Sequence, residues 1–283
     1  MQQETSSPLG IVAGYGRFPY LLARKARQEG RRVIAIAFEG QTQPDMEKAA
    51  DKLFWFKLGE LDRPLRTLRR EGVRQAILAG KIQHNSMYKH LGLPDLRALK
   101  IFAGLPDRRA DTILKAVAQE FAKEGIELLS SATYLSDFIP QKGVLTRRTP
   151  GAAEEKDIRL GLQVAKQLAG LDVGQTVVVK AGAVIAVEAM EGTDACIERA
   201  GSIARCASEP GMVVVKVAKP KQDLRFDLPV IGTRTVEILK LSGAGTLAVE
   251  AGKTLILDRP EVLRQADEAG IAVVAVSMEE PHG

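Results

Sequence analysis

Short apolar runs that alternate with amphipathic stretches are the feature that most constrains the fold of this chain. A strand, a helix and a second strand in succession place the two strands parallel, with the helix on one face of the sheet. The first half repeats this order, which predicts an α/β domain that is Rossmann-like, with a mostly parallel sheet. Strands are predicted at Leu9–Ala13, Val33–Phe38, Leu53–Leu58, Gln75–Leu78 and Ile126–Leu129. Helices are predicted at Pro19–Gly30, Pro64–Glu71, Leu96–Leu105 and Asp111–Lys123.

The pattern is interrupted between Ser136 and Glu155, where turn residues collect. We place a linker at residues 139–155, between an N-terminal domain of residues 1–138 and a C-terminal domain of residues 156–283. A length of 283 residues suits two domains of ordinary size. The second domain also alternates helices and strands, and its strands on either side of Gly182 form a hairpin. It is therefore predicted as a mixed-sheet α/β domain.

Composition narrows the class of protein. No apolar run approaches the roughly 20 residues of a membrane-spanning helix, and Met1–Pro8 lacks the apolar core of a secretory signal, so a cytoplasmic protein is expected. Two cysteines ten positions apart and three scattered histidines do not suit a zinc site. The net charge of +5 is spread along the chain without a basic block, which favours anionic small molecules over nucleic acid.

The first candidate site is the glycine turn that contains Gly14, Tyr15 and Gly16, between the first strand and the first helix. Backbone amides in such a turn can bind phosphate. The turn resembles a dinucleotide fingerprint, with Glu39 as the ribose-binding acid, but Pro19 replaces the third glycine. Three interpretations stay open here: a nucleotide or sugar-phosphate contact, a nicotinamide site, and a turn without a ligand.

Gly80 and Lys81 follow another strand of the same predicted sheet. The carboxyl ends of parallel strands meet at one edge, so Lys81 is a candidate phosphate ligand near Gly14. A solvated lysine after a turn glycine is the alternative. Asp111 begins a predicted helix, where an aspartate is more simply a helix cap.

Two motifs in the second half carry the remaining candidates. Glu188 follows an apolar run without a neighbouring cation, and Thr193 and Asp194 begin a helix, where they can bind substrate or merely cap the helix. The loop from Lys219 to Pro229 mixes cations, an amide and two aspartates, and hard oxygen ligands of this kind suit magnesium. A surface loop with compensating charges is the alternative.

Read together, four stretches resemble the LpxI family, the UDP-2,3-diacylglucosamine pyrophosphatases of lipid A assembly. They are Ile11-Val-Ala-Gly-Tyr-Gly-Arg-Phe-Pro19, Leu78-Ala-Gly-Lys81, Val187-Glu-Ala-Met-Glu-Gly-Thr-Asp194 and Lys219-Pro-Lys-Gln-Asp-Leu-Arg-Phe-Asp-Leu-Pro-Val-Ile-Gly232. The last two are long and specific. The chain departs from the family at Arg109-Ala110-Asp111, where a Gly-Asp-Asp sequence is frequent.

The resemblance implies hydrolysis of UDP-2,3-diacylglucosamine to UMP and the acylated sugar 1-phosphate called lipid X, with Mg²⁺ as cofactor. It makes Asp227 the catalytic residue. Because a metal would neutralise the charge of the pyrophosphate, Asp227, Glu188 and Asp223 are the predicted metal ligands. The substrate-binding residues expected from the motifs are Gly14, Tyr15, Gly16, Gly80, Lys81, Asp111, Thr193, Asp194, Lys219, Gln222 and Arg225.

An acylated substrate also implies transient contact of a cytoplasmic protein with the inner face of the inner membrane, and a homodimer is compatible with this interpretation. Two rival functions remain at this point. One is an NAD(P)-dependent oxidoreductase, which rests on Gly14, Gly16 and Glu39. The other is a protein that binds a nucleotide-sugar without turning it over.

Overall fold

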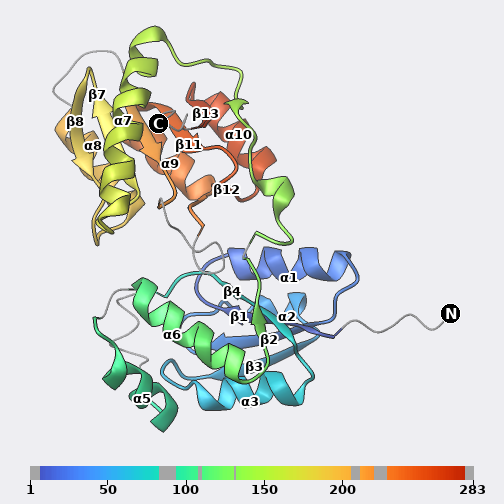
Figure 1. Ribbon diagram of the computed structural model, residues 1–283. Coiled ribbons are helices and arrows are strands. Elements are labelled where there is room, and N and C mark those ends of the chain that lie inside the picture. The colour runs from blue at the N-terminus through green and yellow to red at the C-terminus, as the bar shows by residue number, and fades with distance from the viewer. Residues whose placement is uncertain are drawn as a thin grey trace. The chain divides into compact units, whose positions relative to one another are not determined.

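The computed structural model describes residues 7–82, 94–107, 110–130, 132–204, 211–219 and 228–277. The chain divides into two compact units between Leu135 and Ser136. Each unit combines helices with a sheet (Figure 1), so the predicted two-domain α/β class is confirmed. Among the described helices, none combines the length and the apolar character that a bilayer crossing requires.

The first unit has an all-parallel sheet of five strands in the order β3-β2-β1-β4-β5. The strands are β1 (Leu9–Ala13), β2 (Val33–Phe38), β3 (Lys52–Phe56), β4 (Gln75–Ala79) and β5 (Glu127–Leu128). The helices are α1 (Phe18–Gln28), α2 (Met46–Ala49), α3 (Asp62–Arg70), α5 (Leu96–Gly104) and α6 (Ala110–Lys123). This is the predicted Rossmann-like arrangement.

The two central strands, β1 and β2, are almost entirely apolar and buried, as expected of strands covered on both faces. Leu9 lies between Val33 of β2 and Gln75 of β4 in the sheet register. The strand order reverses between β1 and β4. In an open parallel sheet, the carboxyl ends of the strands at such a reversal are where ligands usually bind.

The second unit has a mixed sheet of six strands in the order β6-β13-β11-β9-β7-β8. The strands β9, β11 and β13 are parallel, whereas β7, β8 and β6 pair antiparallel. Their bounds are β6 Gly143–Val144, β7 Thr176–Lys180, β8 Ala183–Val187, β9 Met212–Lys216, β11 Ala244–Glu250 and β13 Ala272–Val276. A separate parallel pair joins β10 (Val230–Ile231) to β12 (Leu255–Ile256). The predicted mixed sheet is confirmed.

Helices cover both faces of this second sheet, and alternate residues of each strand point to opposite faces. Val213 and Val215 of β9 pack with α7 (Ala152–Gly170), whereas Val214 packs in the cluster on the other face. That second cluster takes apolar residues from α8 (Thr193–Ala204), α9 (Thr233–Ser242) and α10 (Arg259–Glu268). The sheet is therefore buried on both sides.

The segment that the sequence predicts as a linker, residues 139–155, lies within the second unit. It contains β6, whose neighbour Leu145 donates from its backbone N–H to the Val273 carbonyl at 2.8 Å. Arg148 forms two hydrogen bonds of 2.8 and 2.9 Å with the Glu154 carboxylate, and Thr246 donates to the same carboxylate at 2.7 Å. These contacts attach the segment to β11 and β13.

Candidate functional site

In the first unit, the turns that follow β1 and β4 are joined through their backbones. Tyr15 N–H donates to the Lys81 carbonyl at 2.7 Å, and Lys81 N–H donates back to the Tyr15 carbonyl at 3.2 Å. A Cβ atom on Gly14 would lie 2.8 Å from the Lys81 carbonyl oxygen. One on Gly80, whose φ is +88°, would lie 2.7 Å from the Tyr15 carbonyl oxygen. Both glycines are therefore required by the close approach of the two turns.

This backbone bridge lies between the carboxyl ends of β1 and β4, where a dinucleotide would be expected. Pro19, in the first turn of α1, also lies against the bridge, with its Cγ 3.0 Å from the position that a Cβ atom on Gly80 would take. Glu39 is exposed at the end of β2 and donates its N–H to the Phe56 carbonyl at 3.0 Å. The glycine pattern thus has a packing cause, and it gives the nicotinamide interpretation no separate support.

Two other residues of the turns remain available to a ligand. Gly16 has a φ of +103°, and a Cβ atom built on it would meet nothing within 4 Å. The Lys81 side chain is exposed, and it makes no ion pair within the described part of the chain. The structure thus brings Gly14, Tyr15, Gly80 and Lys81 together, as the sequence predicts. An anion beside Lys81 would meet an uncommitted ammonium group.

In the second unit, the predicted residues Glu188 and Thr193 meet at one edge of the sheet. The Thr193 hydroxyl donates to Glu188 Oε1 at 3.0 Å and accepts a hydrogen bond of 2.6 Å from Lys216 Nζ. The second Glu188 oxygen accepts from the backbone N–H of Gln175 at 3.4 Å. Thr193 therefore connects a carboxylate to a lysine ammonium.

Lys216 is the unexpected member of this group, because its side chain is only 7% exposed. It ends β9 and lies opposite Thr176 of β7, whose hydroxyl is 3.3 Å from that of Thr193. Within the described residues, the ammonium has the Thr193 hydroxyl as its one hydrogen-bond partner. A lysine ammonium has three donors, so this buried cation can still bind an anion.

Asp194 follows Thr193 in the first turn of α8 and is exposed. The nearby Cys196 is fully buried, and burial raises the pKa of its thiol to about 11. An uncharged thiol of this kind is a poor nucleophile, so it is a structural residue.

The chain that leaves β9 is fixed by a buried ion pair. Glu250, at the end of β11, accepts from Lys166 Nζ at 2.6 Å and from the Ala218 N–H at 2.9 Å. Lys166 also donates to the Ala218 carbonyl at 2.7 Å, so both polar groups of that peptide position are held. The next residue, Lys219, pairs with Asp172 at 2.6 Å. These contacts define where the chain enters the predicted substrate-binding loop.

Most of that loop lies outside the described residues. This applies to the predicted catalytic Asp227, to the predicted metal ligand Asp223, and to the predicted substrate ligands Gln222 and Arg225. The side chain of Asp111 also lies outside them. The roles of these five residues stay predictions.

The described carboxylates do not form a metal site by themselves. Over the described ranges, no three His, Cys, Asp or Glu side chains come together as metal ligands do. Both oxygens of the predicted ligand Glu188 accept hydrogen bonds from protein groups, one of them from Thr193. Each oxygen keeps a second lone pair, so these hydrogen bonds orient the carboxylate, and the role of Glu188 as a metal ligand stays a prediction.

Sequence reasoning missed Lys166, Thr176, Lys216 and Glu250. A signal exists for two of them. Lys216 interrupts the apolar run Met212–Ala218, and Glu250 ends the apolar run of β11. A charged residue at the end of a buried strand needs a polar or oppositely charged partner, because an unpaired buried charge is costly. Such a residue therefore marks a candidate binding site at that end of the sheet. Nothing in the sequence around Lys166 distinguishes it from a solvated helix lysine.

The fold and the strand ends define a class, namely an α/β protein of two units, each with a cationic side chain available to a phosphate ligand. The LpxI N-terminal domain matches residues 8–138, and the LpxI C-terminal domain matches residues 141–274. The chain belongs to the LpxI family. It is 32% identical over 281 residues to the UDP-2,3-diacylglucosamine pyrophosphatase LpxI of Caulobacter vibrioides, covering 96% of this chain and 98% of that relative.

Solved structures add little to this assignment. Rhizobium etli pyruvate carboxylase with the activator acetyl coenzyme A is 13% identical over 65% of this chain and 17% of that chain, with a TM-score of 0.27. The biotin carboxylase domain of Hydrogenobacter thermophilus 2-oxoglutarate carboxylase is 14% identical over 71% of this chain and 42% of that chain, also with a TM-score of 0.27. TM-scores this low do not establish a shared fold.

Proposed function

We propose that this chain is a hydrolase that cleaves the pyrophosphate of UDP-2,3-diacylglucosamine, giving UMP and 2,3-diacylglucosamine 1-phosphate. The observation that carries the proposal is the correspondence with the Caulobacter vibrioides pyrophosphatase across nearly the whole of both chains. Both units match domains of the same family, so the complete two-unit architecture is shared. A nicotinamide-dependent oxidoreductase would not be expected to share it.

Charge explains why lysines matter for this reaction. A pyrophosphate diester is anionic and repels an attacking hydroxide, so its hydrolysis needs positive charge that is already in place. Lys216 offers an ammonium group that is buried and held by Thr193. A buried cation interacts more strongly with an anion than an exposed one does, because less water screens it. We assign Lys216 to stabilisation of phosphate oxygens and Lys81 to substrate binding.

The proton acceptor or water-positioning group in this proposal is Asp227, by its place in the family motif Asp-Leu-Pro. Magnesium is part of the proposal, with Asp227, Asp223 and Glu188 as its ligands. When bound, the ion would neutralise phosphate charge and acidify a bound water. Glu188 also orients the Thr193 hydroxyl, which accepts a hydrogen bond from Lys216.

The proposed substrate carries two acyl chains, so the proposal includes transient contact with the inner face of the inner membrane. A cytoplasmic location is also proposed, because the UDP part of the proposed substrate is a cytoplasmic metabolite. The rival interpretation, a protein that binds a nucleotide-sugar without turnover, rests on the glycines Gly14 and Gly16 and treats the acids as helix caps and surface charges. Product formation separates the two.

The test is UMP release from UDP-2,3-diacylglucosamine in detergent micelles by the purified full chain. Asp227→Ala is expected to lower kcat by several orders of magnitude while substrate binding persists, because the change removes the reacting group alone. Asp223→Ala, which removes another proposed metal ligand of the same loop, is also expected to lower kcat. Glu237→Ala on α9, an exposed carboxylate outside the proposed site, is the control and is expected to keep normal turnover. Chelation of divalent metals is expected to abolish the activity. A folded Asp227→Ala variant with near-normal turnover would refute the assignment.

A further inference from the structure

The helix α5 has its amphipathic character reversed. Leu96, Leu99 and Phe102 follow each other at a spacing of three residues, and their exposed fractions are 78%, 49% and 50%. Ala98 is the one residue of this helix that is buried. A surface helix normally turns its apolar face toward the core, because burial of apolar area stabilises the fold. Here three large apolar side chains face the solvent instead.

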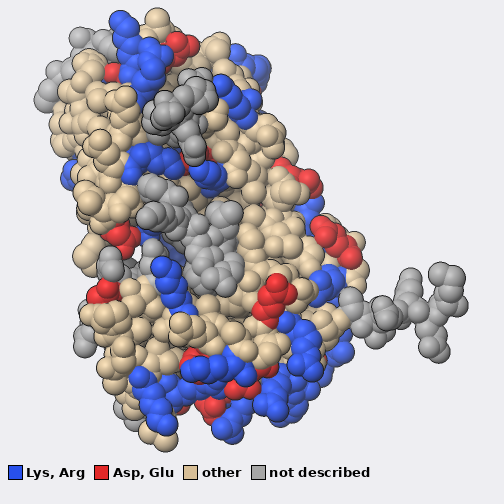
Figure 2. All heavy atoms as spheres, viewed as in Figure 1, with Lys and Arg blue, Asp and Glu red and all other residues tan. Residues whose placement is uncertain are grey.

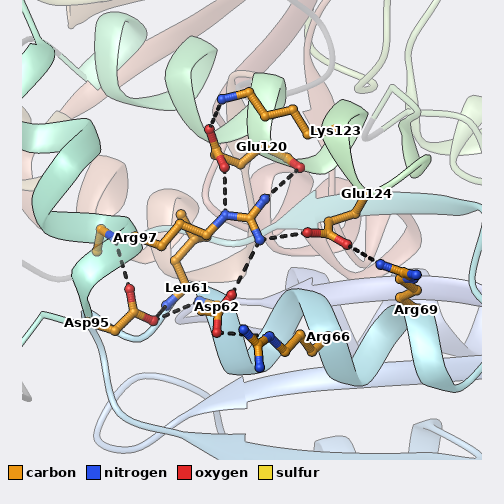
Figure 3. A network of polar contacts seen from close by, with 10 residues as sticks. Leu61, Asp62, Arg66, Arg69, Asp95, Arg97, Glu120, Lys123 and Glu124 are labelled. Atoms are coloured by element: carbon orange, nitrogen blue, oxygen red, sulfur yellow. Dashed lines mark hydrogen bonds and ion pairs between the residues drawn. The ribbon is translucent and has the colours of Figure 1, made fainter.

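The inner side of α5 is attached through charges (Figure 3). Arg97 of this helix bonds to Glu120 of α6 at 2.6 Å and to Glu124, the residue that follows α6, at 2.7 Å, and its side chain is only 19% exposed. These carboxylates outweigh the effect of burial and raise the pKa of Arg97. Asp95 caps α5 through the Ala98 N–H at 2.8 Å and accepts the N–H groups of Leu61 and Asp62 at 2.7 Å.

The polar network in Figure 3 therefore fixes the orientation of α5 against α3 and α6 without using its apolar stripe. Turning the helix to bury Leu99 would break several buried ion pairs, which typically costs a few kcal/mol. The outward direction of the apolar stripe is thus built into the fold. An apolar stripe that the fold keeps exposed is expected to have a partner.

A groove of about 560 Å³ lies between α5 and α6, and the residues that line it indicate the chemistry of that partner. Its apolar lining includes Ile101, Leu105 and Ala116, and two of its lysines are Lys100 and Lys115. Within the described residues, neither lysine has an ion-pair partner. Helix α3 of the same unit has four arginines, of which Arg63, Arg66 and Arg69 pair with carboxylates. Figure 2 shows basic side chains interspersed with acidic ones along the lower edge of the view.

We infer that α5 and the α5–α6 groove are the surface by which this protein docks on an anionic lipid bilayer. Apolar side chains flanked by lysines that have no ion-pair partner among the described residues match the requirements of the membrane interface, where acyl chains lie beneath anionic headgroups. A bilayer takes up an exposed stripe without needing a complementary shape. The inference rests on the proposed function in one respect, since an acylated substrate gives the protein a reason to approach the bilayer.

The experiment is cosedimentation of the full chain with vesicles of phosphatidylethanolamine and phosphatidylglycerol, with phosphatidylcholine vesicles for comparison. Leu99→Glu is expected to lower the partition coefficient at least tenfold, because it removes one apolar anchor of about 1.5–3 kcal/mol. Lys100→Glu is expected to lower it at least about fivefold, and on the anionic vesicles alone, because it removes one positive charge and adds a negative one. Leu241→Glu and Lys240→Glu on α9 are the matched controls, since Leu241 is 71% exposed.

Turnover in detergent micelles and sedimentation velocity are measured for the same variants. Unchanged micellar turnover with lost vesicle binding supports the docking surface. Vesicle binding that is insensitive to Leu99→Glu, or equally sensitive to Leu241→Glu, overturns it. A change of oligomeric state in the α5 variants also overturns it, because the stripe would then bind a second copy of the chain. Absence of UMP release from the unmodified chain would refute the proposed function and leave the vesicle result to be judged separately.

Discussion

Glu250→Gln is expected to destabilise the second unit strongly. The carboxylate of Glu250 is 3% exposed and pairs with Lys166, whose side chain is 14% exposed. Loss of the charge leaves the Lys166 ammonium buried beside a neutral amide, with the Ala218 carbonyl as its remaining partner. Breaking a buried pair in this way costs about 3–5 kcal/mol. Since Lys166 keeps one hydrogen bond, the expected loss is near the lower limit, about 3 kcal/mol.

Lys166→Met is expected to cost less, roughly 1.5–3 kcal/mol, because Glu250 keeps the Ala218 N–H and the exposed Lys253. The double variant is expected to lose little more than Glu250→Gln alone, since the buried charge without a partner is then gone. Burial raises the pKa of Glu250, but hydrogen bonds from Lys166 and Lys253 outweigh it, and the net pKa is lowered. The ion pair therefore stabilises the fold in full above the pKa of a glutamate in the unfolded chain. This stabilisation is lost as the pH falls through the lowered pKa of Glu250 in the folded chain.

The assay combines urea denaturation followed by circular dichroism with amide hydrogen exchange in β9 and β11. The chain has a single tryptophan, Trp55, which lies in β3 of the first unit, so its fluorescence reports on that unit alone. Glu250→Gln is expected to shift the dichroism transition and the exchange of residues 212–219 while the Trp55 transition is unchanged. The reasoning would be refuted if residues 212–219 of Glu250→Gln exchanged their amide hydrogens at the rate of the unmodified chain. It would also be refuted if the free-energy losses of the two single variants added up in the double variant.

Three further predictions concern the candidate sites. Gly80→Ala should lower the urea midpoint of Trp55 fluorescence more than Gly72→Ala does, because both positions have positive φ but a new Cβ is crowded at Gly80 alone; equal shifts would contradict the bridge. Lys81→Ala should raise KM with kcat little changed, and a collapse of kcat at constant KM would exclude a binding role. Lys216→Met should lower kcat/KM at undiminished thermal stability, because removal of a buried charge relieves its desolvation; unchanged turnover would remove Lys216 from the site.

The main strands could be predicted because buried strands need long apolar runs, and β1 and β2 consist of such runs. The assignment of β6 could not, since two residues, Gly143 and Val144, contain no periodicity and pair only because β13 offers an open edge. The helix α5 was predicted, but not its reversal. Periodicity shows that apolar residues share a face, and only the ion pairs of Arg97 show that this face points outward.

The candidate site shows the same limit. The motifs predicted correctly that Gly14 and Gly80 lie together, and the structure adds that they contact each other. The partnership of Glu188 with Thr193 follows from their separation in sequence, but Lys216 joins them only through the antiparallel pairing of β7 with β9. A contact between strands distant in sequence requires the sheet order, which periodicity does not contain.

The bridge between Tyr15 and Lys81 has a consequence for how relatives of this chain can vary. A side chain at Gly14 would collide with the backbone that follows β4, and a side chain at Gly80 would collide with the backbone that follows β1. Replacing either glycine alone therefore makes the new side chain collide with the backbone of the opposite turn. The two positions form one evolutionary unit: a relative that lacks glycine at one of them must also have changed the length or path of the opposite turn. An alignment should show the two positions changing together.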